Sequence, residues 1–173
     1  MWLKMDLDGI IVSLQVRGYK KVADDDWDST WCKTDFSFIS EPWLNYQKRN
    51  DEVFLAREID GLSDVLKALL ENRLAEKTEF NCIEPDFNFT LNPVKDLRLD
   101  PNVTYVSPGH EFVDIDMEWQ VSFWHDGLTA NYLSVTLSRE EIEYLLTYLR
   151  LVTGEICEDD PAIKRLIQMN IIY

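Results

Sequence analysis

The residues of this chain best suited to chemistry are carboxylates that alternate along one predicted strand. Asp114, Asp116 and Glu118 occupy every second position, so a strand would project them from one face about 7 Å apart. Divalent cations prefer such oxygen ligands, and a pair of carboxylates can divide acid and base roles. No neighbouring histidine or glycine-rich phosphate loop supports either chemistry. The face is therefore a solvated strand face, an acidic surface for a partner, or a metal or catalytic site.

A second concentration of acid lies at Asp24–Trp31, which reads Asp-Asp-Asp-Trp-Asp-Ser-Thr-Trp. Asp is disfavoured in strands, and Asp and Ser both favour turns. The two indoles are too large and apolar to stay in water without a reason. We expect a turn that leads into a strand starting near Trp31. It is either a turn anchored by its tryptophans or an acidic, aromatic binding edge made of Asp24, Asp25, Asp26, Trp27, Asp28 and Trp31.

Other kinds of reactive site have little support in the sequence. The three cysteines, Cys32, Cys82 and Cys157, are far apart, and the histidines are His110 and His125. Such a set argues against a disulfide framework, a zinc site and a Ser-His-Asp arrangement. No P-loop, dinucleotide fingerprint, nucleophile elbow or EF-hand loop is present. We therefore expect a protein that is not an enzyme and that has no cofactor and no metal.

The charge balance points to the kind of partner. The chain has 32 acidic residues against 17 basic ones, a net charge of −15. Nucleic acid is disfavoured because its phosphates would be repelled, whereas a basic protein would be attracted and its encounter accelerated. The alternative is that the charge serves solubility alone. No apolar run approaches the roughly 20 residues that span a bilayer, and the acidic N-terminus is unlike a signal peptide. We expect a cytoplasmic protein, a monomer or weak homodimer, with no membrane partner.

Apolar periodicity predicts the elements that position these residues. In the first half, Asp8-Gly9 predicts a hairpin turn, and Asp60 is the predicted N-cap of an amphipathic helix over 61–74. Residues 47–52 are predicted as a turn. The predicted strands of this half cover residues 3–7, 10–16, 31–40 and 53–57.

The second half has the clearest strand, over 112–124, with Val113, Ile115, Met117 and Trp119 on its buried face. A hairpin turn follows at His125-Asp126-Gly127. The loop over 92–110, with a short strand at 103–106, is either functional or a tolerated insertion. Further strands are predicted at 78–83, 86–91 and 129–137. A helix is predicted over 138–153, and it opens with a Ser138–Glu141 capping box. A short helix should follow Asp160-Pro161, with Ile163, Leu166 and Ile167 facing inward, and the end of the chain at 171–173 should be docked.

The predicted elements define an α+β fold, mostly antiparallel β-sheet built from hairpins, with two principal amphipathic helices packed on one side. The length of 173 residues fits a single domain over 1–173. Both halves run from a hairpin through a strand into an amphipathic helix. A diverged internal duplication of about 1–75 and 78–153 is therefore the alternative organisation.

The opening of the chain also resembles a known family. An apolar strand, Gly18-Tyr19, a short acidic link, the motif Asp25–Trp31 and a further strand are similar to the opening of the WapI-like immunity proteins. The step from Val53–Ala56 into Gly61–Leu70 is a second point of similarity. These bacterial proteins neutralise the toxic C-terminal domain of wall-associated polymorphic toxins. The resemblance covers about the first 75 residues well.

The resemblance implies an immunity-type binding protein. Its partner would be a basic toxin domain, a nuclease, which it neutralises by steric occlusion and charge complementarity. Two alternatives stay open at this point. One is a general cytoplasmic acidic binding module, and the other is a metal-dependent hydrolase that uses Asp114 and Asp116.

Overall fold

Alternating apolar and polar residues build a first antiparallel sheet from the N-terminal part of the chain. The computed structural model describes residues 1–21 and 30–173, and in this part of the chain the sheet has four strands in the order β1-β2-β3-β4. Their bounds are β1 Leu3–Leu7, β2 Ile10–Arg17, β3 Trp31–Ser40 and β4 Leu44–Leu55. Asp8 and Gly9 have φ angles of 52° and 86°, as a type I′ turn requires. The predicted hairpin is confirmed.

The fourth strand differs from the prediction. The sequence predicts a turn over residues 47–52, but β4 runs through them without a break. This strand lies at the edge of its sheet, where charged side chains are common because one row of backbone groups faces solvent. Register shifts against β3, one of them between Thr34 and Phe36, accommodate the polar stretch. The prediction is wrong because polar composition does not distinguish a turn from an edge strand.

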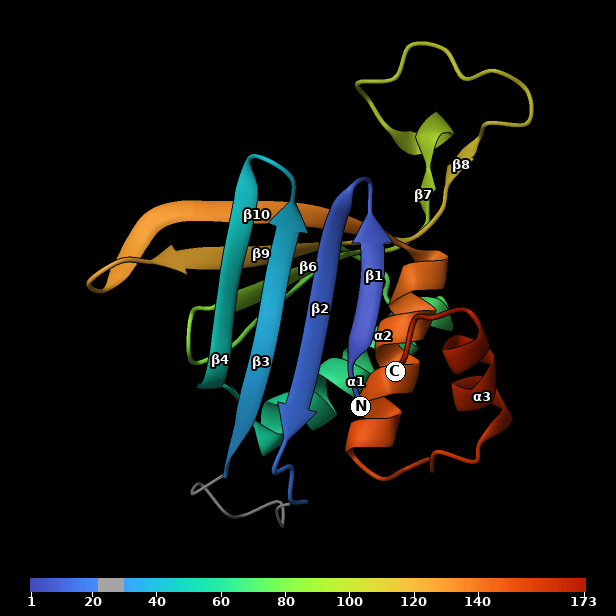
Figure 1. The fold of residues 1–173 in the computed structure, drawn as a ribbon. Coiled ribbons are helices and arrows are strands. Elements are labelled where there is room, and N and C mark those ends of the chain that lie inside the picture. Colours follow the sequence, from blue (N-terminus) through green and yellow to red (C-terminus); the bar gives the residue numbers. More distant parts are fainter. Residues whose placement is uncertain (22–29) are drawn as a thin grey trace.

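The C-terminal half contributes a second antiparallel sheet, with the strand order β10-β9-β6-β5. Its strands are β5 Thr78–Asn81, β6 Phe87–Asn92, β9 Asp116–Trp124 and β10 Leu128–Ser138. Figure 1 shows this sheet behind the first one, with its strands running across β1 to β4. The strands predicted over 78–83 and 86–91, and the hairpin that joins β9 to β10, are confirmed with small shifts at their ends.

A long excursion between β6 and β9 stands out from both sheets (Figure 1). We call residues 93–113 the arm. It contains β7 Lys95–Asp96, the 3-10 helix η1 Leu97–Leu99 and β8 Phe112–Val113, and β7 pairs with β8. The short strand predicted at 103–106 is wrong, because the structure has turns and irregular backbone there.

The start of the clearest predicted strand also needs correction. Val113 belongs to the arm and is 43% exposed, so the prediction that it is buried is wrong. The alternation of apolar and polar residues extends back to Val113, but this residue lies in the arm, outside the core. From Ile115 onward the prediction is confirmed, since Ile115, Met117 and Trp119 are buried.

Three helices lie in the described part of the chain: α1 Ala56–Leu70, α2 Arg139–Val152 and α3 Pro161–Gln168. Figure 1 shows α1 behind the lower part of the first sheet and α2 alongside β1, and the two helices are in contact. The capping box of α2 is confirmed, with Glu141 Oε2 accepting from the Ser138 amide at 2.7 Å. Among the described residues, no helix combines the length and apolarity needed to cross a membrane.

Neither end of α1 is where the sequence placed it, because the helix covers Ala56–Leu70 and not 61–74. Asp60 lies within the helix, and the helix begins directly after β4. The carboxylate of Glu58 takes the capping role, because its Oε2 accepts from the Leu55 amide at 2.8 Å. Its Oε1 accepts from the Ile83 amide at 2.6 Å, so this buried side chain also fixes the connection between β5 and β6.

The C-terminus is docked, as predicted. Ile172 is fully buried and bridges to Leu3 at the edge of the first sheet. The Trp2 amide donates to the Tyr173 carbonyl at 2.7 Å. In α3, Ile163 and Leu166 face inward as predicted. The inward placement of Ile167 is wrong, since it is 38% exposed on the outer side of the helix.

The two sheets share one aromatic core. Trp119 of the second sheet contacts Phe38 of the first, with ring centroids 5.4 Å apart, and Phe87 of its own sheet at 5.1 Å. Phe36 and Phe87 join the sheets again at 4.8 Å. All four rings are at most 1% exposed. Edge-to-face and tilted contacts of this kind add to the stabilisation from burial.

Replacing Trp119 by alanine should therefore destabilise the protein strongly. We expect a loss of about 3–5 kcal/mol in the free energy of unfolding, as for other buried aromatic residues, measured by urea denaturation. Trp43 is 65% exposed in the turn between β3 and β4. Its replacement by alanine is the matched control, and we expect a change within about 0.5 kcal/mol. Equal effects of the two substitutions would contradict this description of the core.

Candidate binding surfaces

The acidic residues predicted on one strand face do face outward, but they have different roles. Asp114 lies just before β9 and forms a bidentate ion pair with Arg139, at 2.6 Å from Nη2 and 2.9 Å from Nε. Arg139 Nη1 also donates to the Leu70 carbonyl at 3.2 Å. The hydrogen bond from Arg139 holds the pKa of Asp114 below its ordinary value. Asp114 therefore connects the end of the arm to α2 and to the end of α1.

Asp116 and Glu118 lie on the outer face of the second sheet. The side chain of Asn92 donates to Asp116 Oδ1 at 2.7 Å. Glu118 is exposed between Thr90 of β6 and Thr136 of β10, which are its neighbours in the register of the sheet. This face is polar and open.

The described residues give little geometric support to a metal site or to a reactive thiol at Cys32. Among them, no group of three or more His, Cys, Asp or Glu side chains is placed to hold a metal ion. The oxygens of Asp114 and Asp116 accept hydrogen bonds from protein donors. Cys32 is buried, and its burial raises the pKa of its thiol to about 11. A thiol that stays protonated at neutral pH is a poor nucleophile.

The acidic run near the N-terminus falls largely outside the described residues. Asp24, Asp25, Asp26, Trp27 and Asp28 all lie within 22–29, so their role stays a sequence-based prediction. Trp31 is described, and it is the first residue of β3, as predicted. It pairs with Leu55 and is half-buried.

The described segments that flank the acidic run lie at one end of the first sheet, and the arm lies at the other. In Figure 1 the end of β2 and the start of β3, which flank residues 22–29, lie at the bottom of the first sheet. The arm and β8 lie at the opposite, upper end.

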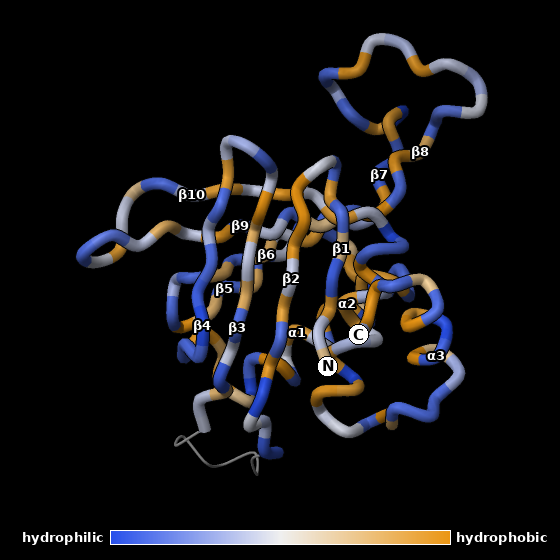
Figure 2. The backbone as a smooth tube through the Cα atoms, viewed as in Figure 1, coloured by the Kyte–Doolittle hydropathy of each residue, from blue (hydrophilic) through white to orange (hydrophobic). Residues whose placement is uncertain are grey.

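The arm exposes apolar side chains that the sequence analysis did not single out. Leu99 is 81% exposed, Tyr105 is 75% exposed and Phe112 is 60% exposed. Figure 2 shows hydrophobic positions along this segment, away from the core. Arg98 lies over the Phe112 ring at 5.2 Å and is ion-paired with Asp96 at 2.6 Å. In the sequence, Tyr105 could have indicated an exposed aromatic side chain, because it lies in a proline-containing loop without the apolar periodicity of a core element.

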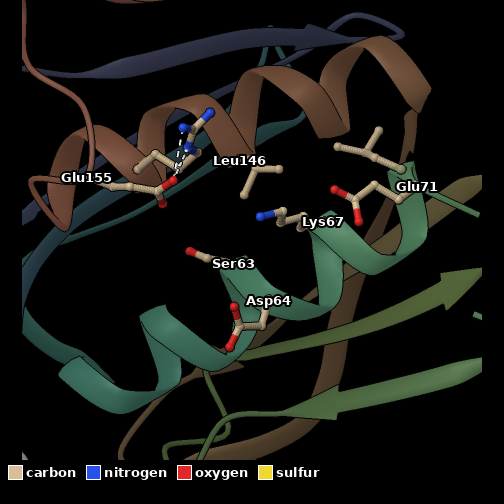
Figure 3. A pocket seen from close by; sticks show the side chains of 8 residues that line it. Ser63, Asp64, Lys67, Glu71, Leu146 and Glu155 are labelled. Atoms are coloured by element: carbon tan, nitrogen blue, oxygen red, sulfur yellow. Dashed lines mark hydrogen bonds and ion pairs between the residues drawn. The ribbon is translucent and has the colours of Figure 1, made fainter. Parts of the chain in front are cut away.

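Pockets of mixed charge lie at the base of the arm and between α1 and α2. At the base of the arm a pocket of about 460 Å³ is lined by Lys77, Asn92, Val94, Lys95, Val113, Asp114, Asp116 and neighbouring residues. Figure 3 shows a second pocket, of about 270 Å³, between α1 and α2. Lys67 and Glu71 extend into it from α1, and Arg150 is paired with Glu155 at 2.9 Å along its rim. Both pockets mix charges of either sign, so neither selects a simple ion.

Comparison with known proteins identifies one family. The model of the Immunity protein WapI-like family matches residues 3–155. The match includes both sheets, the arm, α1 and α2, and therefore extends well beyond the opening that carries the resemblance in the sequence. No curated protein and no solved structure matches the chain.

The ion pair of Asp114 with Arg139 should make a small, pH-dependent contribution to stability. Replacing Asp114 by asparagine should cost about 0.2–1 kcal/mol at pH 7, because the pair is exposed and screened by solvent. The folded-state pKa of Asp114 is lowered. The contribution is therefore complete above the unfolded-state pKa of about 3.9 and is lost as the pH falls through the folded-state value.

Urea denaturation at pH 7 and at pH 3 measures this difference. Glu118→Gln is the matched control, because Glu118 is exposed and forms no ion pair among the described residues. Its replacement should leave the free energy of unfolding unchanged at both pH values. A cost of Asp114→Asn that is the same at both pH values would show that the ion pair is not its cause.

Proposed function

Because the chain belongs to the WapI-like immunity protein family, we propose that it neutralises a basic bacterial toxin domain, a nuclease, by binding across its active site or its substrate channel. The observation that carries the proposal is the family match combined with the net charge of −15. A nuclease attracts phosphates with a positive surface. An acidic protein is complementary to that surface and competes with the substrate for it.

The proposed mechanism is steric occlusion preceded by electrostatic steering. The acidic field of the whole molecule accelerates the encounter with a basic partner. Asp116 and Glu118 on the second sheet then meet lysine and arginine side chains of the toxin. Asp114 is a weaker candidate for contact than these two, because it is already held by Arg139.

The acidic run Asp24–Trp31 remains a proposed contact surface on sequence grounds. Its four carboxylates and two indoles fit the composition of an interface, where tryptophan is enriched among the residues that dominate binding. The exposed aromatic residues of the arm, Tyr105 and Phe112, are further candidates for the same reason.

We propose that the chain acts in the cytoplasm as one domain, as a monomer or a weak homodimer. The shared core supports the single domain, because residues of β1 to β4 and of β6, β9 and β10 pack in one continuous cluster. Steric occlusion requires no catalysis by the immunity protein itself. The proposed function therefore has no cofactor and no metal.

Association with the toxin domain should depend strongly on salt. Raising the NaCl concentration from about 0.1 M to about 1 M shortens the Debye length from about 10 Å to about 3 Å. We expect the association rate constant to fall roughly tenfold or more, with a smaller effect on dissociation. Stopped-flow or surface-based kinetics with the C-terminal domain of a candidate wall-associated toxin measures both rates.

A pair of charge-reversal variants tests whether the acidic run is a contact. One variant replaces Asp24, Asp25 and Asp28 by lysine. The other replaces three exposed carboxylates by lysine, at Glu76, Glu143 and Glu158, and so changes the net charge equally. We expect the first variant to slow association and also to accelerate dissociation, whereas the second only slows association. Binding that is indifferent to salt and to both variants would contradict the proposed function.

A further inference from the structure

The second sheet has one edge that differs from the other edges of the two four-stranded sheets in the described structure. β10 has a hydrogen-bonded strand on one side only, because it is the last strand in the order β10-β9-β6-β5. It is 11 residues long and contains no charged residue, in a chain that is 28% charged. Long, uncharged and uncovered edges are ready templates for another strand, and proteins usually protect them.

The other edges of the two described four-stranded sheets are protected. β1 is covered by the C-terminal segment, since the Lys4 amide donates to the Ile171 carbonyl at 2.7 Å. β4 carries charged residues, among them Lys48, Asp51 and Glu52. β5 has only four residues, and Glu79 is one of them. β10 has an irregularity in its register with β9 between Leu128 and Tyr132, but from Tyr132 to Ser138 its pairing is regular and its edge is uncharged.

The hydrogen bonds show which groups of β10 point outward. The Ser122 amide of β9 donates to the Asp86 carbonyl at 2.9 Å, so Ser122 directs its backbone groups away from β10. Tyr132 is its partner in the register. In an antiparallel pair both members of such a position face away from each other. Tyr132, and with it Ser134 and Thr136, therefore direct their N–H and C=O groups to the free edge.

Three further contacts agree with this orientation. Thr129 Oγ1 donates to the Phe123 carbonyl at 2.7 Å, which places the odd-numbered groups of β9 on the β10 side. The Trp124 amide donates to Tyr46 Oη at 3.3 Å, on the opposite side. The Ser138 amide, at the end of the edge, is satisfied by Glu141 rather than by a strand. Side chains along the edge are open, with Tyr132 60% exposed.

Charge around the edge indicates its occupant. Residues 116–138 form the β9–β10 hairpin and contain three carboxylates, Asp116, Glu118 and Asp126, but no lysine or arginine. Two copies of this chain would bring like charges together at this edge, at a net charge of −15 each. A strand rich in lysine and arginine would instead have its charges matched by these acids.

We propose that β10 receives an extended, basic strand of the toxin domain and adds it to the second sheet. This inference rests on the proposed function and specifies how the partner is held. The incoming strand pairs with the free backbone groups of Tyr132, Ser134 and Thr136, while its basic side chains face Glu118 and Asp116. Strand addition draws its affinity from backbone hydrogen bonds and its specificity from the flanking side chains.

A proline scan of the free edge tests the proposal. Ser134→Pro removes an amide that points away from β9, so the ladder within the protein keeps its bonds. We expect its melting temperature to stay within about 3 °C of the wild type. The dissociation constant for the same toxin domain should rise about tenfold or more. Ser134→Ala keeps the amide and is the matched control, with near wild-type binding.

Amide hydrogen exchange gives a readout that does not depend on a variant. The amides of Ser134 and Thr136 should exchange quickly in the free chain and at least about tenfold more slowly in the complex. The amides of Trp119 and Val121, which point into the ladder, are the internal reference. If Ser134→Pro fails to fold, this measurement alone decides between an occupied and an unoccupied edge.

The outcomes separate this inference from the proposed function. Wild-type chain that does not bind the toxin domain would refute both. Equal toxin binding by wild type and Ser134→Pro, with no new protection of the Ser134 and Thr136 amides, would refute strand addition at β10. The proposed function would be unaffected by that result. A wild-type homodimer in sedimentation that the Ser134→Pro substitution dissociates would show that a second copy of the chain occupies the β10 edge. That result would overturn the proposal that a toxin strand pairs there.

Discussion

The structure depends on the aromatic contact between the two crossing sheets. Phe36 and Phe38 of the first sheet meet Phe87 and Trp119 of the second, and all four rings are buried. A polar contact supports this junction at its margin. Lys48 of β4 reaches the buried carboxylate of Asp86 at 2.7 Å and lies 4.5 Å from the Trp124 ring. Burial raises the pKa of Asp86 even beside this lysine.

This junction determines which surfaces are free. The apolar face of each sheet packs against the other sheet and against α1 and α2. The outer faces are therefore polar and exposed to solvent. Because the second sheet runs across the first, β10 forms an upper edge in Figure 1 and its hairpin with β9 projects beyond β4. The arm rises on the side of β1, away from this hairpin. The candidate contacts that the structure describes on the second sheet are therefore held by a rigid core, as precise binding surfaces require.

Much of the fold followed from local patterns in the sequence. The strict alternation of Met117 and Trp119 with Asp116 and Glu118 predicted both the strand and its buried face, because each residue type matched its surroundings. The same alternation misplaced Val113, since the chain had already entered the arm. The start of α1 depends on Glu58 reaching the amides of Leu55 and Ile83. No local capping pattern reveals a contact with a residue 25 positions away.

The candidate binding surfaces were less accessible to sequence analysis. Acidic residues could be located, but the pairing of Asp114 with Arg139 arises only from the packing of the arm against α2. The uncharged composition of residues 128–138 is visible in the sequence. It gains meaning only when the strand order places β10 at an edge.

The central claim is that the chain neutralises a toxin by stoichiometric binding. Titrating the nuclease activity of the toxin domain with purified chain, at concentrations well above the dissociation constant, tests this most directly. Activity should fall linearly and vanish at one molecule of chain per toxin domain, and EDTA added to the chain beforehand and then removed should change nothing. Inactivation by far less than one equivalent would show catalysis by the chain, and activity that persists at a large excess would show that it does not block the toxin. Either result would contradict the account.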